Sequence, residues 1–381
     1  MKDTKNRIKV ITVLAFLIAL LSVGIGYSSY NTTIEVSGKA IAIENVYDIR
    51  LDNINSVISS EIGGVSSVID LFAGSGAVSH YFKSNGLKTI SNDFLYFSYV
   101  LLQADIMLNS EPNFDKLGIG NPIEYLNCLT LTDTEFKIED CFIYNHYSPV
   151  GDCRRMYFRP ENALKIDIIR MTIEKWKNNS LISENEYFYL LSALINAVPF
   201  VANITGVYAA YLKYWDERTY KHIELKKPVI INNRQDNECY NLDYTELLNK
   251  SCDLLYADPP YNSREYLPNY HILETIARYD YPEIHGVTGM RNYDNQKSVF
   301  CKKNMVYSAF ETLVRDCKSK YILISYNNEA LLSTQELSDI CRKYAVNGSF
   351  KLFEYNYRRY KNKIPNNAKG LKEQLYFLRR Y

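Results

Sequence analysis

The stretch of sequence that decides the fold is Ser67–Gly76, which reads SVIDLFAGSG. Its first five residues form a short run rich in β-branched side chains, which predicts a strand, and Gly74 and Gly76 follow in a turn. Residues 77–82 then show a helical pattern. A strand that leads through a glycine turn into a helix N-terminus lets a ligand approach the backbone of a doubly wound sheet. We therefore expect a mixed α/β domain with a largely parallel sheet from about Val65 onward.

A second predicted strand, Lys88–Ser91, ends at the dipeptide Asn92-Asp93. Asp93 lies 23 positions after Asp70, close to the spacing of about 20 residues at which an acid meets ribose hydroxyls. Two glycines alone also occur in ordinary tight turns. The strand, the loop, the helix and the delayed acid together indicate a nucleoside-cofactor site. The third glycine of the dinucleotide fingerprint is absent, which disfavours nicotinamide and flavin cofactors.

Residues 253–257 predict a buried strand, and this strand ends in Asp258-Pro259-Pro260-Tyr261. Because ligands of open α/β sheets bind beyond the carboxyl ends of strands, we expect this tetrapeptide to face the same crevice as Gly74. Two prolines fix φ and remove backbone donors, so the turn is rigid and presents an acid, carbonyl groups and an aromatic ring. An exocyclic amine is a poor nucleophile until acceptors bind its two hydrogens. Asp258 and the Pro259 carbonyl could supply both acceptors, and Tyr261 could stack on a flipped base. An ordinary proline-rich turn is the alternative.

Together these motifs resemble the Dam-like, alpha-group DNA adenine-N6 methyltransferases of restriction and modification systems. The resemblance covers about residues 66–381 and includes the continuation of the tetrapeptide, Asn262–Tyr266. It implies a Rossmann-like S-adenosylmethionine-dependent methyltransferase fold with a helical target-recognition insertion. The implied methyl donor is S-adenosylmethionine, the implied substrate is double-stranded DNA, and a cognate restriction endonuclease is an implied partner. Cytosine-N4 methylation shares the same geometry and stays open.

The resemblance also implies residue roles. Asp93 would hold the ribose of the donor and Asp243 would face its adenine, while Asp258 would touch both the donor's amino group and the target amine. The catalytic residues that it implies are Asp258, Pro259, Pro260 and Tyr261. The cofactor-binding residues are Asp70, Phe72, Gly74, Gly76, Asp93, Asp243 and Asp258.

About 150 residues separate the second strand from Asp243, far more than an ordinary loop. We expect residues 45–99 and 226–381 to form the catalytic domain and residues 100–225 to form the target-recognition insertion. The insertion contains predicted helices at 162–177 and 184–197. Three arginines (Arg154, Arg155 and Arg159) and the segment Thr205–Lys213 combine basic with aromatic side chains, which suits phosphate contacts and base stacking. A solvated helix face would explain the same residues equally well.

Charge and cysteine content narrow the class of protein. Lys and Arg number 44 against 43 Asp and Glu, so no global field attracts nucleic acid or anionic lipid. Residues 351–381 hold nine Lys or Arg and two acids, and we interpret this basic segment as a sign of a polarised, DNA-binding surface. The eight cysteines include no C-x-x-C pair, so we expect no zinc site.

The N-terminus conflicts with this chemistry. Four cations precede an apolar run at residues 10–27, which predicts a signal sequence or a single-pass membrane anchor, with a buried core helix as the alternative. Residues 28–52 show alternation typical of short strands, so residues 1–44 are expected to be a separate segment. A methyltransferase belongs in the cytoplasm, whereas the charge rule would place the rest of the chain outside.

Three interpretations of the N-terminus stay open. The chain could be a fused or misjoined gene with an incomplete enzyme, which we favour and which predicts weak donor binding. It could be an anchored protein whose catalytic domain stays in the cytoplasm, with membrane contact through residues 10–27. The apolar helix could instead pack onto the fold. An exported, noncatalytic protein with a decayed methylase domain is the alternative from another functional class.

Overall fold

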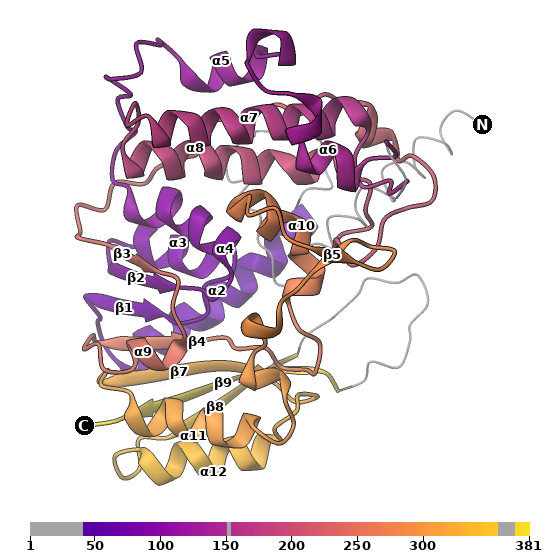
Figure 1. Cartoon of the computed structure of the whole chain (residues 1–381). Coiled ribbons are helices and arrows are strands. Elements are labelled where there is room, and N and C mark those ends of the chain that lie inside the picture. The colour runs from indigo at the N-terminus through magenta and orange to yellow at the C-terminus, as the bar shows by residue number, and fades with distance from the viewer. Residues whose placement is uncertain (1–40, 151–153, 357–369) are drawn as a thin grey trace. The chain divides into compact units, whose positions relative to one another are not determined.

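The central sheet has seven strands among the residues that the computed structural model describes, which are 41–150, 154–356 and 370–381. The strand order is β3-β2-β1-β4-β7-β9-β8 (Figure 1). The first five strands in this order pair in parallel, whereas β9 is antiparallel to both β7 and β8. The bounds are β1 Ser67–Asp70, β2 Lys88–Asn92, β3 Glu238–Tyr240, β4 Leu254–Ala257, β7 Tyr321–Asn327, β8 Lys351–Asn356 and β9 Lys372–Arg379. The prediction of a mixed α/β domain with a largely parallel sheet is therefore confirmed.

Helices cover both faces of this sheet, which explains why the central strand β4 (LLYA) is buried along its whole length. Alternate strand residues point to opposite sides, so Val68 packs with α2 and α3 while Ile69 packs with α9, α11 and α12. Figure 1 shows α11 and α12 together on one side of β7, β8 and β9. The helices are α2 Ile41–Glu61, α3 Ala77–Ser84, α9 Tyr244–Leu247, α11 Val306–Asp316 and α12 Thr334–Tyr344.

The chain divides into two compact units. Unit 1 holds the sheet and comprises the described residues up to Phe94, Asn233–Glu265 and Lys297–Tyr381. Unit 2 comprises Leu95–Asn232 and Tyr266–Gln296. The predicted insertion, residues 100–225, falls within unit 2, but the segment Tyr266–Gln296 was expected in the catalytic domain. The recognition role of unit 2 stays a prediction.

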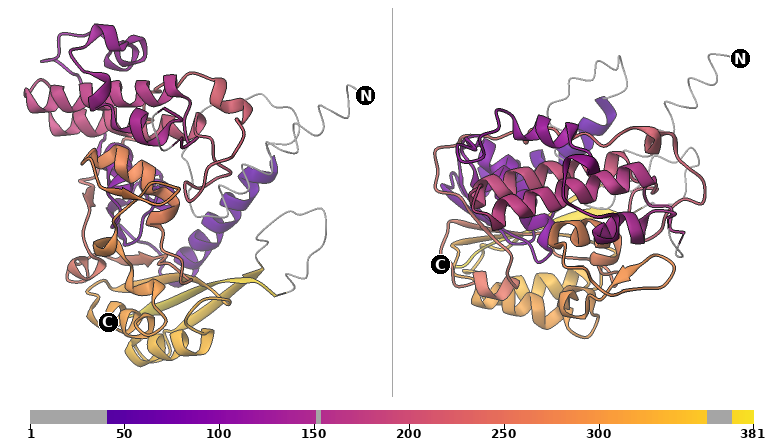
Figure 2. Two further views of the ribbon diagram at one scale, coloured as in Figure 1. Left: turned by 45° about the vertical axis from the view of Figure 1, so that its right-hand side comes forward. Right: turned by 45° about the horizontal axis from the view of Figure 1, so that its top comes forward.

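Unit 2 is mainly helical, and α7 and α8 lie side by side in it (Figures 1 and 2). Ser183 and Glu186 form a capping box that starts α8, since each side chain bonds the other's backbone N–H. The elements are α4 Tyr96–Leu102, α5 Pro122–Cys128, α6 Phe142–Tyr147, α7 Pro160–Asn178, α8 Glu184–Ala197, α10 Leu267–Arg278 and the hairpin strands β5 Ile284–His285 and β6 Met290–Arg291. Both helices predicted in the insertion are thus present.

Buried charged side chains explain why α10 belongs to unit 2. Glu274 accepts hydrogen bonds from the backbone N–H groups of Tyr96 and Phe97, at 3.1 and 2.9 Å, and so caps the start of α4. Arg170 of α7 donates to the carbonyls of Ile276 and Ala277 near the end of α10, at 2.9 and 3.1 Å. A helix end that is buried needs such partners. These long-range bonds leave no signal in a local sequence pattern.

The prediction of short strands is wrong for residues 41–52, because they lie in α2. Ile54, Val57 and Ile58 of this helix are buried against the sheet, and their spacing of three and four residues is that of a helix face. Figure 2 shows α2 (indigo) as one long helix. The predicted apolar segment at residues 10–27 lies outside the described residues. Within the described ranges, no helix has the length and apolar character needed to cross a membrane.

Two parts of the basic C-terminal segment, residues 351–356 and 372–379, form the strands β8 and β9. Lys351 of β8 pairs with Glu61 of α2 at 2.7 Å, and Lys372 of β9 pairs with Glu354 at 2.7 Å. Arg380 donates to backbone carbonyls at 2.6 and 2.8 Å. These three cations are engaged within unit 1, and the interpretation of the basic segment as a DNA-binding surface stays a prediction. The cations between residues 357 and 369 lie outside the described residues.

Candidate active site

The glycine loop between β1 and α3 is bonded to both neighbouring strands. Leu71 N–H donates to the Tyr256 carbonyl at 3.0 Å, and Ala73 N–H donates to the Asn92 carbonyl at 2.8 Å. Gly74 and Gly76 have φ of 56° and 86°, a left-handed conformation that side chains disfavour. Among the described residues, no side chain caps α3, so its first-turn amides face the loop. The loop is a backbone cradle at the carboxyl end of β1.

Asp93 is attached directly to this cradle. Its Oδ2 accepts a hydrogen bond from Gly74 N–H at 2.8 Å, and its own N–H donates to the Tyr240 carbonyl at 3.2 Å. The Asn241 side chain donates to the Asp93 carbonyl at 2.8 Å. The acid predicted at the end of the second strand therefore lies beside the glycine loop, where a carboxylate can accept hydroxyl hydrogens.

Asn92 is a site residue that the sequence analysis quoted but gave no role. Its buried amide donates to the carbonyls of Leu71 and Leu242, at 3.2 and 3.1 Å, and accepts from Leu242 N–H at 3.0 Å. It thereby joins the ends of β1 and β2 to the turn before α9. A polar residue at the end of an apolar strand was the available signal, since a buried amide must be hydrogen-bonded.

The predicted donor residues Asp70 and Phe72 are largely engaged within unit 1. Asp70 is 1% exposed, and its Oδ2 accepts from Ser79 Oγ at 2.7 Å, which lies 2.7 Å from Ser91 Oγ. This chain of bonds fixes α3 on β1 and β2. The Phe72 ring packs edge-on against Phe300, with centroids 5.2 Å apart. Their proposed contacts with a donor stay predictions.

Asp243 occupies an exposed turn after β3. Its Oδ1 accepts from the N–H and the Oγ1 of Thr245, at 3.0 and 2.5 Å, so it caps the short helix α9. The Asn92 bonds to Leu242 fix the residue before it. The position of Asp243 is therefore set by the hydrogen bonds between Asn92 and Leu242. The contact of Asp243 with an adenine ring stays a prediction.

The tetrapeptide begins one residue beyond β4, which lies between β1 and β7 in the sheet. Pro259 is buried, whereas Asp258 and Tyr261 are half-buried. The Tyr261 carbonyl accepts from Leu331 N–H at 3.0 Å, and its ring packs on the core of unit 1. Glu265 accepts from Ser298 N–H at 3.0 Å. The loop is therefore held at both ends.

These pieces converge because their strands are parallel neighbours. Asp70 of β1 lies opposite Ser91 of β2 and opposite Tyr256 of β4, so all three strands end at one edge of the sheet. The glycine loop, Asp93 and Asp258 follow directly from these ends. The expectation that they share one edge agrees with this register.

One of the three arginines of the insertion, Arg155, has a different role from the one expected. Arg155 is buried and donates to the carbonyls of His146, Gly286 and Val287, at 2.9, 3.0 and 3.0 Å. It holds the hairpin of β5 and β6 and is not available for phosphate. His271 of α10, to which we assign no chemical role, is also buried, and burial lowers its pKa to about 4. Its Nε2 lies 2.9 Å from the Tyr208 carbonyl.

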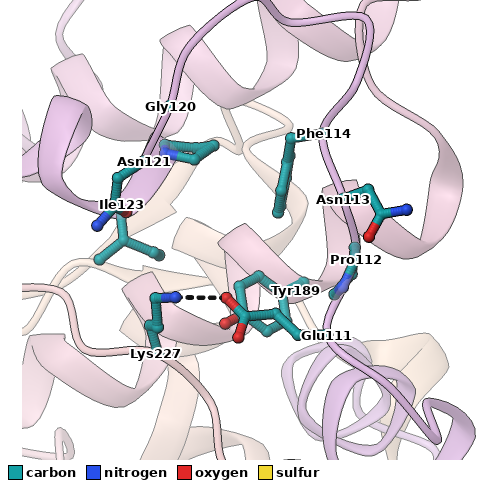
Figure 3. A pocket seen from close by; sticks show the side chains of 10 residues that line it. Glu111, Pro112, Asn113, Phe114, Gly120, Asn121, Ile123, Tyr189 and Lys227 are labelled. Atoms are coloured by element: carbon teal, nitrogen blue, oxygen red, sulfur yellow. Dashed lines mark hydrogen bonds and ion pairs between the residues drawn. The ribbon is translucent and has the colours of Figure 1, made fainter.

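Unit 2 also contains a cavity of about 370 Å³ that is remote in sequence from the motifs above. Figure 3 shows its lining, with Phe114 and Tyr189 on the wall and a cation facing an acid. Lys227 Nζ lies 2.6 Å from Glu111 Oε1. Each charge neutralises the other, so this cavity offers no strong site for a charged ligand.

Comparison with known proteins identifies the family of this chain. The model of the D12 class N6 adenine-specific DNA methyltransferases matches residues 50–340, which include the glycine loop, Asp93 and the tetrapeptide. The chain belongs to this family. The mixed α/β architecture agrees with an S-adenosylmethionine-dependent methyltransferase fold.

Curated relatives support the same conclusion. The type II methyltransferase M.FokI of Planomicrobium okeanokoites is 45% identical over 336 residues, which are 87% of this chain and 51% of that protein. The modification methylase StsI of Streptococcus sanguinis is 39% identical, over 87% of this chain and 50% of its own length. The type II methyltransferase M.NlaIII of Neisseria lactamica is 37% identical, over 77% of this chain and 83% of its own length. The chain thus spans about half the length of the first two relatives.

The residues of unit 1 fit the donor that this family generally uses, S-adenosylmethionine. Gly74 and Gly76 leave the cradle without side chains at positive φ, so backbone can approach a ligand closely. The Asp93 carboxylate beside it is an acceptor for hydroxyl groups, and the ring of Phe72 is a half-buried apolar surface. Within the described ranges, no three His, Cys, Asp or Glu side chains cluster as metal ligands would.

Proposed function

We propose that this chain transfers a methyl group from S-adenosylmethionine to the N6 amine of adenine in double-stranded DNA, at one short sequence. It would act as the modification enzyme of a restriction system, in the Dam-like class that carries the tetrapeptide Asp258–Tyr261. The observation that carries the proposal is the shared sheet edge of the glycine loop, Asp93 and Asp258, in a chain of the D12 family.

The residues that follow β1 and β2 would bind the methyl donor. We assign the ribose hydroxyls to Asp93, whose carboxylate is already oriented by Gly74 N–H. Asp243 would face the adenine, and the cradle with Asp70 and Phe72 would line the remaining parts. When bound, the donor supplies an electrophilic methyl group on a sulfonium. Asp258 would hold its amino group.

Activation of the target amine rests on the tetrapeptide. The Asp258 carboxylate and the Pro259 carbonyl accept the two amine hydrogens, which makes the nitrogen lone pair available for attack. Oriented acceptors of this kind contribute about 2.7–4 kcal/mol to transition-state binding. Tyr261 stacks on the flipped base, a contact worth about 1–3 kcal/mol. The bonds that hold the loop to Leu331 and Ser298 keep these groups in place.

The activity places the enzyme with its substrates in the cytoplasm, and a cognate endonuclease is the partner that a modification enzyme of this kind serves. Membrane contact through residues 10–27 is a separate question that the described residues do not address. Their removal is therefore one arm of the test.

Modification-sensitive sequencing of genomic DNA tests the proposal. A methylation-free host would express either the full chain or residues 45–381. N6-methyladenine at one short motif is the expected result, and a mark from the shortened chain only would show that the N-terminus misdirects the enzyme. N4-methylcytosine would replace the adenine assignment. Absence of any mark, with folded protein present, would favour the decayed, noncatalytic alternative.

A further inference from the structure

We propose that residues 212–222 of unit 2 form a preformed DNA-contacting surface, held in shape by the buried side chains of Asn203 and Asn162. The contacting side chains would be Lys213, Tyr214, Tyr220 and Lys221, with Arg159 beside them. This inference rests on the proposed function, because it concerns how the DNA substrate is held.

Asn203 holds the first half of the segment. Its side chain is fully buried, and its Nδ2 donates to the carbonyls of Leu212 and Tyr214, at 2.9 and 3.0 Å. Its Oδ1 accepts from Asp216 N–H at 3.1 Å, and its backbone carbonyl accepts from Leu212 N–H at 2.9 Å. One residue therefore fixes the path of the chain from 212 to 216.

Asn162 of α7 repeats this arrangement for the second half. Its buried Nδ2 donates to the carbonyls of Thr219 and Lys221, at 3.2 and 2.8 Å, and its Oδ1 accepts from Ile223 N–H at 2.9 Å. The segment has little regular structure, with only the 3-10 turn Glu217–Tyr220. Figures 1 and 2 show the chain from α8 to β3 (pink to salmon) as largely without helix or strand. Side-chain amides replace the ladder bonds that would otherwise stiffen it.

This fixed backbone leaves large aromatic side chains in water. Tyr214 is 67% exposed and Tyr220 is 61% exposed, and Lys213 and Lys221 next to them are exposed as well. The Arg159 guanidinium is paired with Glu161 at 2.8 Å, and it lies 4.4 Å from the centre of the Tyr220 ring and 5.5 Å from that of Trp215. Exposed aromatic groups on a rigid frame are typical of a binding surface.

The composition of the surface favours nucleic acid over a protein partner. Lysine is depleted at protein interfaces, whereas lysine, arginine and tyrosine side chains together fit the phosphates and sugars of a DNA backbone. The neighbouring acid Asp216 points its Oδ1 toward Arg218 and caps the 3-10 turn, so part of the local negative charge is neutralised. We therefore assign a DNA duplex as the occupant.

Two tyrosines that precede the exposed part of the segment anchor it. Tyr208 is buried, and its carbonyl accepts from Tyr157 Oη at 2.8 Å. Tyr211 is half-buried with its ring packed edge-on against Tyr157. These two tyrosines therefore tie the start of the segment to the interior of unit 2, and its first exposed side chain is that of Lys213.

The test measures binding of the full chain to an unmethylated duplex that contains the motif which the enzyme modifies. Fluorescence anisotropy would record this binding at several salt concentrations. We expect Tyr214→Ala and Tyr220→Ala each to weaken binding about fivefold or more, because truncation of an aromatic side chain that carries an interface costs more than about 1 kcal/mol. Lys213→Gln and Lys221→Gln should each lower the slope of log affinity against log salt by about 0.9. Phe200→Ala is the matched control, since Phe200 is also 61% exposed in unit 2 but lies outside the segment.

Donor affinity, measured by calorimetry, separates this inference from the proposed function. All five variants should bind S-adenosylmethionine as the unaltered chain does. If the chain methylates DNA but the four surface variants bind duplex normally, or if Phe200→Ala weakens binding equally, the surface assignment is overturned while the proposed function stands. If neither the unaltered chain nor any variant methylates DNA, the proposed function is refuted, and the surface assignment that rests on it is refuted with it.

The asparagine frame has its own test. Asn203→Ala should weaken DNA binding and speed hydrogen exchange of the amides of Leu212 and Asp216, while donor affinity is retained. Fast exchange together with normal DNA binding would overturn the claim that the frame positions the contacts. If Asn203→Ala does not fold, the tyrosine variants decide the matter.

Discussion

At the residue scale, Asn92 shows how one buried side chain can set the geometry of a site. Its amide provides a donor and an acceptor at once, and it uses both on backbone groups of Leu71 and Leu242. Aspartate at this position would keep the acceptor and lose both donated bonds, leaving two carbonyls with fewer partners. Leu71 opens the glycine loop and Leu242 precedes Asp243, so this one amide positions both sides of the proposed donor site.

Asp258 carries the residue-scale prediction on chemistry. Asp258→Ala should abolish methyl transfer, because it removes one of the two acceptors of the target amine, while binding to duplex DNA stays largely intact. Methyl transfer from a tritiated donor and duplex binding by anisotropy are the two measurements. Asp339→Ala on the exposed face of α12 is a control expected to change neither. Normal transfer by Asp258→Ala would refute the catalytic assignment.

Gly76 carries a second residue-scale prediction, on donor binding. An alanine at its φ of 86° costs roughly 1–2 kcal/mol of strain, and relief of that strain must move the loop. We expect Gly76→Ala to weaken S-adenosylmethionine binding about tenfold or more in calorimetry. Gly86→Ala is matched, because Gly86 has a φ of 79° and open space around it. It should lower the melting temperature similarly and leave donor affinity within about twofold. Equal donor affinity of both variants would contradict the cradle.

What the sequence revealed at this scale depended on local signals. Gly74, Gly76, Asp93 and Asp258 stand at fixed positions after apolar strands, and strand ends are readable from the pattern. Arg155 could not be read in this way, because its three carbonyl partners include residues more than a hundred positions away. An arginine that binds phosphate and one that holds a distant hairpin look the same in sequence.

At the element scale, strands with a local sequence signal were predicted, and strands that depend on long-range contacts were not. β1 and β4 each contain a run of buried apolar residues, because both faces of the sheet are covered there, so each stands out from its surroundings. β8 and β9 were interpreted as a basic tail, because a charge count treats paired and free cations alike. The pairs Lys351 with Glu61 and Lys372 with Glu354 depend on the sheet itself. Likewise, α2 is defined by the sheet that buries its one apolar face.

Asp253 carries the element-scale prediction, since it joins the starts of β1 and β4. Its Oδ2 accepts four hydrogen bonds of 2.6 to 3.1 Å, from the N–H and Oγ groups of Ser66 and Ser67. Burial alone would raise the pKa of this carboxyl, but these bonds together outweigh it and hold the pKa below its ordinary value of 3.8. The carboxylate therefore stabilises the fold above about pH 4, and this contribution is lost as the pH falls through the lowered pKa.

Urea unfolding at pH 7, 5 and 3 tests this pH dependence. The difference in free energy of unfolding between the unaltered chain and Asp253→Asn should be on the order of 1–3 kcal/mol at pH 7 and 5, and should shrink at pH 3. Asp339→Asn, whose partner Arg342 is equally exposed, should change the free energy by under about 1 kcal/mol at each pH. A difference for Asp253→Asn that grows toward acid would contradict the sign of the argument.

At the scale of the whole molecule, each unit supplies its own supporting bonds. The hydrogen bonds of Gly74, Asn92 and Tyr261 lie within unit 1, whereas those of Asn162 and Asn203 to the segment 212–222 and to Ile223 lie within unit 2. The chain enters unit 2 twice, first at Leu95 and again at Tyr266, a few residues after the tetrapeptide. The sequence indicates only one long insertion. The second part of unit 2 is attached through long-range hydrogen bonds, such as those of Glu274 and Arg170, which a local sequence pattern does not reveal.

This division predicts that defects in the two units combine without coupling. Substitutions that share no partners usually add within about 0.5 kcal/mol. We therefore expect the double variant of Gly76→Ala and Tyr214→Ala to show the donor affinity of the first and the DNA affinity of the second. In steady-state kinetics at subsaturating donor and DNA, the losses of transition-state binding should sum within that limit. A coupling free energy above about 1 kcal/mol would show that donor binding and DNA binding share a conformational change, and the two units could then no longer be treated as independent binding modules.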